Sequence, residues 1–219
     1  MKLKELLLET PDFLDKEMPI ITSTSTSTFN FYSIDTINRE FEIVDKSKIG
    51  KIEYWTLLKN DKSSAVIGQL GKRKEDNKIG IQLDGQLEFK NKPDLAFDKL
   101  IKLPEHVLQV DSVEVFTDKF KGIGYLLYMG LASFGYIIVS DHSQYRGGKK
   151  LWEKLSKLST ANNYSVYIVD NGHPVLDDKG EILKYDGTNL ADDKIWSSPT
   201  TNIANSRHNY VLLVLKKHK

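Results

Sequence analysis

A chain of 219 residues with 40% hydrophobic and 28% charged side chains has the composition of an ordinary globular protein and is long enough for a full hydrophobic core. Its formal net charge of +1 gives no global field to attract anionic lipid or nucleic acid, which argues against tight nonspecific binding of DNA. The chain has no cysteine, and this excludes disulfides, thiolate zinc sites and a cysteine nucleophile.

The N-terminal segment predicts no membrane or export function. It has neither the pattern of a secretory signal nor an apolar run of membrane-spanning length, so we expect a cytoplasmic protein without a membrane partner. Residues 3–16 predict a short amphipathic helix, and the Ser/Thr tract at 22–28 predicts a linker or an exposed edge strand. We therefore expect residues 1–28 to be an N-terminal extension and residues 29–219 to form one domain.

Alternating apolar and polar residues predict a series of strands in the first half of this domain. The predicted strands are 29–35, 39–45, 51–59, 65–70 and 78–83. The charged turn between the last two favours antiparallel hairpins. Helical spacing follows at 94–103, where Pro104 ends the predicted helix.

Strands and helices alternate in the second half. The predicted order is a strand at 107–117, a glycine-bearing turn at 119–124, a helix at 123–134, a strand at 136–141, a helix at 148–158 and closing strands at 164–170 and 209–216. Gly135 is placed to terminate the first of these helices. Residues 171–207 predict an insertion. Together these elements indicate an α/β or mixed α+β fold built on one mixed sheet.

The turn before the first helix is suited to a bound phosphate. The first N–H groups of a helix have no intrahelical partner, and small residues let an anion approach them. Gly122 and Gly124 provide that access, and Lys119 and Lys121 add positive charge. A plain strand–helix turn with solvated lysines would show the same residues.

The order of elements resembles the Gcn5-related N-acetyltransferase (GNAT) family, in which an Arg/Gln-x-x-Gly-x-Gly/Ala turn joins a long strand to a helix. The resemblance covers about half of the chain. It implies a GNAT-like mixed sheet flanked by helices with a β-rich N-terminal extension, and acetyl-CoA as cosubstrate. The residues that it implies for cofactor binding are Val115, Phe116, Thr117, Lys119, Lys121, Gly122, Ile123 and Gly124.

Three features depart from the family pattern. Lys119 stands where the family usually has Arg or Gln, and Trp152 stands in a helix where many relatives carry a tyrosine acid. The segment 144–149 is itself a partial match to the glycine turn, so a shifted register that places the cofactor there remains open.

Four residues are candidates for proton transfer from an acceptor amine. Asp111 and Glu114 lie on the predicted central strand, where a carboxylate would line the cleft, lie on an exposed face or form an ordinary salt bridge. Asp141 ends the next strand and also suits a cap, and Tyr145 is the nearest phenol to the second helix. The histidines show no metal-ligand spacing, so no metal site is expected.

Two functions follow from the resemblance. The first is transfer of an acetyl group from acetyl-CoA to a small-molecule or protein amine by direct attack. The second is a catalytically inactive GNAT-like protein, such as a phage inhibitor, that binds a protein partner. A nucleic-acid-modifying relative is a third possibility, which the near-neutral charge disfavours.

Overall fold

The computed structural model describes residues 31–73, 76–91, 106–116, 122–141, 143–159, 163–196 and 211–218, with the short strands at 20–21 and 203–205. They form a mixed α/β structure in which a mostly antiparallel sheet dominates. The chain divides into two compact units, one of Met1–Glu88 and Val113–Phe134, the other of Phe89–Ser112 and Gly135–Lys219. The expected helices at 3–16 and 94–103 and the tract at 22–28 lie outside the described residues, and the expected single domain at 29–219 stays a prediction.

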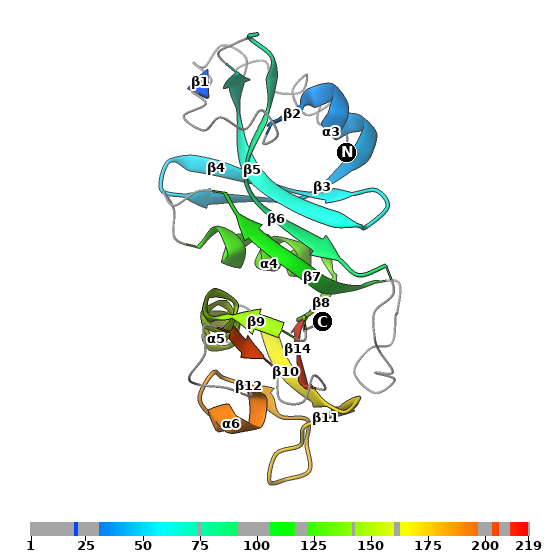
Figure 1. Cartoon of the computed structure of the whole chain (residues 1–219), viewed down its shortest axis with the longest axis vertical. Coiled ribbons are helices and arrows are strands. Elements are labelled where there is room, and N and C mark those ends of the chain that lie inside the picture. Colours follow the sequence, from blue (N-terminus) through cyan, green and yellow to red (C-terminus); the bar gives the residue numbers. More distant parts are fainter. Residues whose placement is uncertain are drawn as a thin grey trace. The chain divides into compact units, whose positions relative to one another are not determined.

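The first unit is built on an antiparallel meander (Figure 1). Its strands are β3 (Phe41–Ile49), β4 (Ile52–Lys59), β5 (Ser64–Arg73) and β6 (Ile79–Phe89), each paired with the next. Two short strands, β2 (Phe31–Ser33) and β1 (Ile20–Ile21), join β6 antiparallel and β5 parallel respectively. The predicted hairpins between residues 51 and 83 are thereby confirmed.

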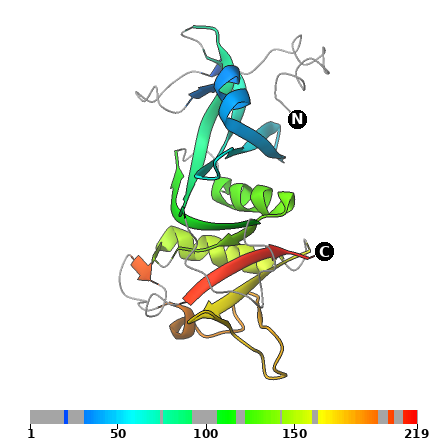
Figure 2. The same ribbon diagram turned by 90° about the vertical axis from the view of Figure 1, so that its right-hand side faces the viewer.

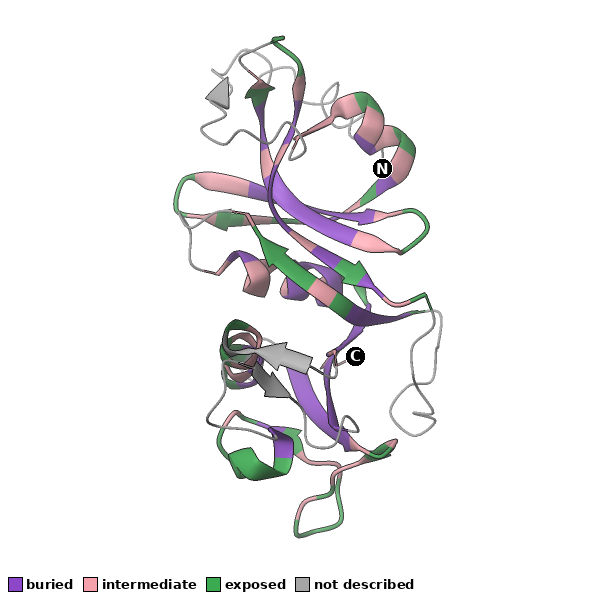
Figure 3. Cartoon of the chain, in the orientation of Figure 1, coloured by how far each residue is buried: buried purple, intermediate pink, exposed green. Residues whose placement is uncertain are grey.

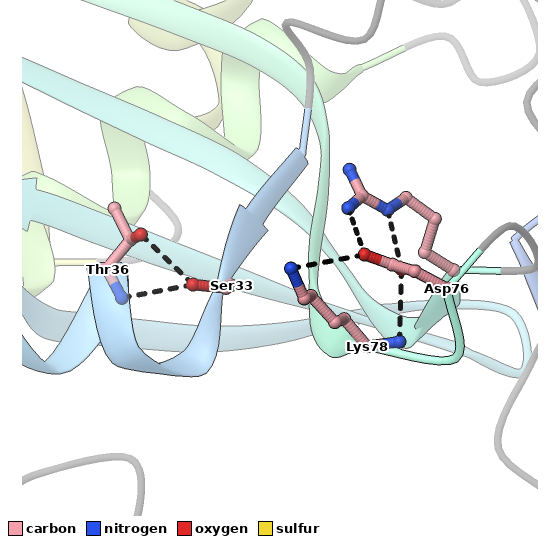
Figure 4. A network of polar contacts seen from close by, with 5 residues as sticks. Ser33, Thr36, Asp76 and Lys78 are labelled. Atoms are coloured by element: carbon pink, nitrogen blue, oxygen red, sulfur yellow. Dashed lines mark hydrogen bonds and ion pairs between the residues drawn. The ribbon is translucent and has the colours of Figure 1, made fainter.

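A helix that the sequence did not predict follows β2. The expected strand at 29–35 is wrong after Ser33, because α3 (Ile34–Glu40) begins there. The Ser33 side chain accepts a hydrogen bond from the Thr36 backbone N–H at 3.2 Å, which is an N-cap contact (Figure 4). The polar residues that looked like the outward face of a strand are the cap and first turn of a helix. The next strand consequently starts at Phe41 rather than at residue 39.

The core of the first unit lies on both faces of β4, where residues Tyr54 to Leu58 are all buried (Figure 3). One face carries an apolar cluster that α3 helps to cover; its buried members are Ile37, Phe41, Trp55, Leu57, Val66, Leu70, Ile81 and Leu83. Helix α4 (Ile123–Phe134) packs on β3, β4 and β5. Its bounds are those predicted, and Gly135 after it has the positive φ of +111° expected of a terminating glycine.

The second unit is a mixed sheet in the order β11-β10-β14-β8-β7. Its long strands are β7 (Val107–Val115), β10 (Tyr164–Asp170) and β14 (Val211–Lys217), with β8 (Ile137–Val139) and β11 (His173–Pro174) shorter. The strands β7 and β8 are parallel, and β14 is antiparallel to both β8 and β10. Figure 2 shows β10 and β14 running side by side in yellow and red.

Helix α5 (Arg146–Ser159) covers this sheet, and the segment that follows β10 packs on α5. The helix contacts β10 and buries Trp152 completely, at 0% exposure. Beyond β10 the chain forms β12 (Lys184–Tyr185) and the short helix α6 (Asp192–Ile195), and Lys149 on α5 binds Asp192 there. A separate pair joins β9 (Ser143–Tyr145) to β13 (Ile203–Asn205). All three tryptophans, Trp55, Trp152 and Trp196, are buried.

Candidate functional site

The burial and the pairing of the central strand β7 change along its length. Its first residues, Val107 to Val110, are buried, and its parallel pairing with β8 covers only Val107–Gln109. Farther along, Val113 and Val115 are 38% and 50% exposed (Figure 3). Val113 and Val115 have the same parity and are exposed on one face of the strand, and the pairing with β8 does not extend to them.

Gly122 directly precedes α4 in the first unit. It has φ +116°, a region that a residue with a Cβ rarely adopts, and its carbonyl accepts the first helical hydrogen bond from Leu126 N–H at 3.0 Å. The N–H groups of Ile123, Gly124 and Tyr125 therefore lie in the first turn, where the positive end of the helix macrodipole lies. Gly122 and Gly124 are half-buried and Ile123 is buried. Thr117, Lys119 and Lys121 lie outside the described residues.

The four candidates for proton transfer lie on three segments of the chain. Glu114, in the first unit, and Asp111, in the second, are exposed on β7 and occupy opposite parities of the strand. Asp141, after β8, is half-buried. Tyr145 ends β9, where it pairs with Ile203 and directly precedes α5, and its side chain is not described.

A buried polar row that sequence reasoning missed lies beside the glycine turn. It joins Tyr54 on β4, Gln69 on β5 and Asp84 on β6: Gln69 Nε2 donates to Asp84 Oδ2 at 2.8 Å and lies 3.3 Å from the Tyr54 hydroxyl. Burial, and then the negative charge of Asp84, raises the pKa of the Tyr54 phenol to about 12. Asp84-Gly85 in the sequence resembles a turn, and it forms a β-bulge in the middle of β6.

The alternative glycine turn has a different structure. Helix α5 begins at Arg146, so Gly147 and Gly148 are helical residues in its first turn. Lys149 Nζ is held by Asp192 Oδ2 at 2.6 Å and lies 3.9 Å from Glu153 Oε1. The negative charges of these carboxylates offset the positive charge of the lysine and weaken its attraction for a phosphate. This argues against the shifted register.

Trp152 has no role at an exposed site. Its side chain is fully buried, and an indole has no proton to give at neutral pH. Trp152 is therefore a packing residue in this chain.

The described residues contain neither a metal-binding cluster nor a membrane-spanning helix. No group of three or more His, Cys, Asp or Glu side chains there could hold a metal ion. In the same part of the chain, no helix combines the length and the apolar character needed to span a membrane.

Comparison with known proteins gives no relative: no family model matches the chain, and no curated protein or solved structure is significantly similar to it.

Proposed function

We propose that the protein is an acyl-CoA-dependent N-acyltransferase with a GNAT-like arrangement of its sheet. The observation that carries the proposal is the combination, within one unit, of the exposed β7 segment Val113–Val115 with a positive-φ glycine directly before α4. An extended arm with a pyrophosphate at its end has the chemistry to use both: the arm pairs with the strand edge, and the phosphates accept from the first-turn N–H groups.

The topology of the second unit supports the same proposal. The strand order β10-β14-β8-β7, with β7 and β8 parallel and α5 placed between β8 and β10 in the chain, follows the connectivity that the resemblance implies. The parallel pairing covers Val107–Gln109 of β7 and Ile137–Val139 of β8, and β7 itself continues to Val115.

In the proposed reaction an acceptor amine attacks the thioester carbonyl of acetyl-CoA directly. The C–S bond breaks, the new C–N bond forms, the thiolate of CoA leaves, and the amine loses a proton. The residues of the chain orient the two substrates and accept that proton. Glu114 is the leading base because it is exposed on the segment that holds the thioester arm; Asp111, Asp141 and Tyr145 are the other candidates.

The second candidate function belongs to a protein with the same fold but without acetyltransferase activity. The burial of Trp152 removes the tyrosine acid of many relatives, which favours an inactive GNAT-like protein that binds a partner. Cofactor binding separates the two proposals only in part, since an inactive relative can retain it; acetyl transfer to an amine separates them fully.

Ligand-dependent stabilisation tests the cofactor. We expect acetyl-CoA and desulfo-CoA to raise the thermal unfolding midpoint by several degrees at millimolar concentration, because a ligand at 100 times its Kd stabilises by about 2.7 kcal/mol. ATP, which lacks the pantetheine arm, should give a smaller rise. An unchanged midpoint with millimolar acetyl-CoA would exclude the acyltransferase proposal.

A further inference from the structure

The polar row Tyr54–Gln69–Asp84 crosses three neighbouring strands of the first unit. Tyr54 and Gln69 are partners in the β4–β5 register, so their side chains lie on one face of the sheet. Tyr54 is 0% exposed and Asp84 is 7% exposed. A carboxylate at this depth loses most of its hydration, and hydrogen-bond donors must replace it. The Gln69 amide supplies one such donor, at 2.8 Å.

The row ends at a bulge in β6. Ile67 on β5 pairs with Gly85, and Gly68 pairs with Leu83, so Asp84 is the extra residue of β6. A bulge turns the strand locally and re-aims its side chains, and bulges are frequent next to active sites. The carboxylate of the bulged residue Asp84 is thus held by a hydrogen bond from Gln69.

The bulge contacts both halves of the proposed cofactor site. The Asp84 carbonyl accepts a hydrogen bond from Phe116 N–H at 2.8 Å, at the end of the segment proposed for the thioester arm. A Cβ on Gly85 would lie 3.0 Å from Ile123 Cγ2 and 3.2 Å from the Glu114 carbonyl oxygen. Ile123, the first residue of α4, thus packs against Gly85, and the residue that follows β7 is hydrogen-bonded to the Asp84 carbonyl.

We propose that Tyr54, Gln69 and Asp84 are positioning residues that set the spacing between β7 and the N-terminus of α4, and through it the affinity for the phosphate-bearing half of the cofactor. This inference rests on the proposed function. The Asp84 carboxylate acts through the bulge, and Tyr54 and Gln69 hold the carboxylate in one orientation. Pre-organised N–H groups bind an anion without reorganisation. In active sites, a misplacement of about 1 Å costs up to about 100-fold in rate.

Calorimetric titration of acetyl-CoA and of adenosine 3′,5′-bisphosphate into the full chain tests the inference. We expect Asp84→Asn and Tyr54→Phe to weaken both ligands by about tenfold or more, and by similar factors, because adenosine 3′,5′-bisphosphate carries a 5′-phosphate in place of the pyrophosphate and lacks the thioester arm. A loss of general packing would instead lower the unfolding midpoint without weakening the two ligands in parallel.

Two matched variants control for the substitutions themselves. Tyr185→Phe removes a buried hydroxyl that has no hydrogen-bond partner in the part of the chain that the structure describes, and it lies in the second unit. Asp61→Asn removes an exposed carboxylate of the first unit. Both controls should bind the two ligands as the unsubstituted chain does.

Each outcome decides between defined alternatives. If the unsubstituted chain binds neither ligand, the proposed function fails and the inference fails with it. If that chain binds but folded Asp84→Asn and Tyr54→Phe bind equally well, only the inference is overturned. Failure of both variants to fold would also overturn it, because the row would then be a requirement of the fold alone.

Discussion

Replacing Gly124 with glutamate should abolish the binding of acetyl-CoA. Gly124 is half-buried in the first turn of α4, beside the N–H groups proposed to hold the pyrophosphate. A carboxylate there repels the phosphates and blocks their approach. Like charges placed together cost several kcal/mol, which corresponds to a loss of about 100-fold or more in affinity. Titration calorimetry on the folded variant measures this loss.

The same substitution should leave the fold intact. A glutamate in the first turn of a helix interacts favourably with the macrodipole, so Gly124→Glu should not lower the unfolding midpoint by more than a few degrees. The control is Gly147→Glu, in the first turn of α5, where an added Cβ meets nothing within 4 Å. If Gly147→Glu abolishes binding and Gly124→Glu does not, the cofactor site belongs to residues 144–149 and the shifted register is correct.

Replacing Trp152 with alanine should destabilise the protein by about 3–5 kcal/mol, the range measured for truncating a buried aromatic side chain. Trp152 is 0% exposed and lies on α5, a helix that packs on β10. Removing the indole leaves a cavity that the close-packed surroundings fill only in part. Urea denaturation followed by circular dichroism gives the change in the free energy of unfolding.

Leu158→Ala is the matched control on the same helix. Leu158 is 39% exposed, so its truncation should cost well under the value for Trp152, about 1 kcal/mol or less. Equal effects of the two substitutions would mean that Trp152 is not a packing residue, and the tyrosine-acid position would have to be reconsidered.

The second half of the fold was largely predictable because its residues have strong and unambiguous periodicity. Residues 123–134 carry apolar residues at helical spacing with a glycine behind them, and the helix has those bounds. The segments at 107–115 and 164–170 are strands close to their predicted limits. In each case local propensity and tertiary packing favour the same structure.

Helix α3 and the bulge at Asp84 were not predictable in the same way. The sequence around Ser33 alternates apolar and polar residues, and only the side-chain contact with Thr36 N–H identifies Ser33 as an N-cap. Asp84-Gly85 is a typical turn sequence, and its place inside β6 depends on Gln69, fifteen residues away. Contacts of this range leave no local pattern in the sequence.

The candidate site was predictable as a set of positions but not as a geometry. The glycine turn was located from its spacing, and the structure adds the positive φ of Gly122 and the exposed end of β7. The contribution of β6 to that region could not be inferred, because a strand pairing places Asp84 against Phe116 across about thirty residues of sequence.

A crystal structure of the full chain with acetyl-CoA would test the central proposal most directly. We predict that the pantetheine arm pairs with the backbone of Val113–Phe116 and that the pyrophosphate accepts hydrogen bonds from the N–H groups of the Gly122–Gly124 segment. Density for the cofactor at the first turn of α5, or crystals grown with millimolar acetyl-CoA that show no cofactor on β7, would contradict it.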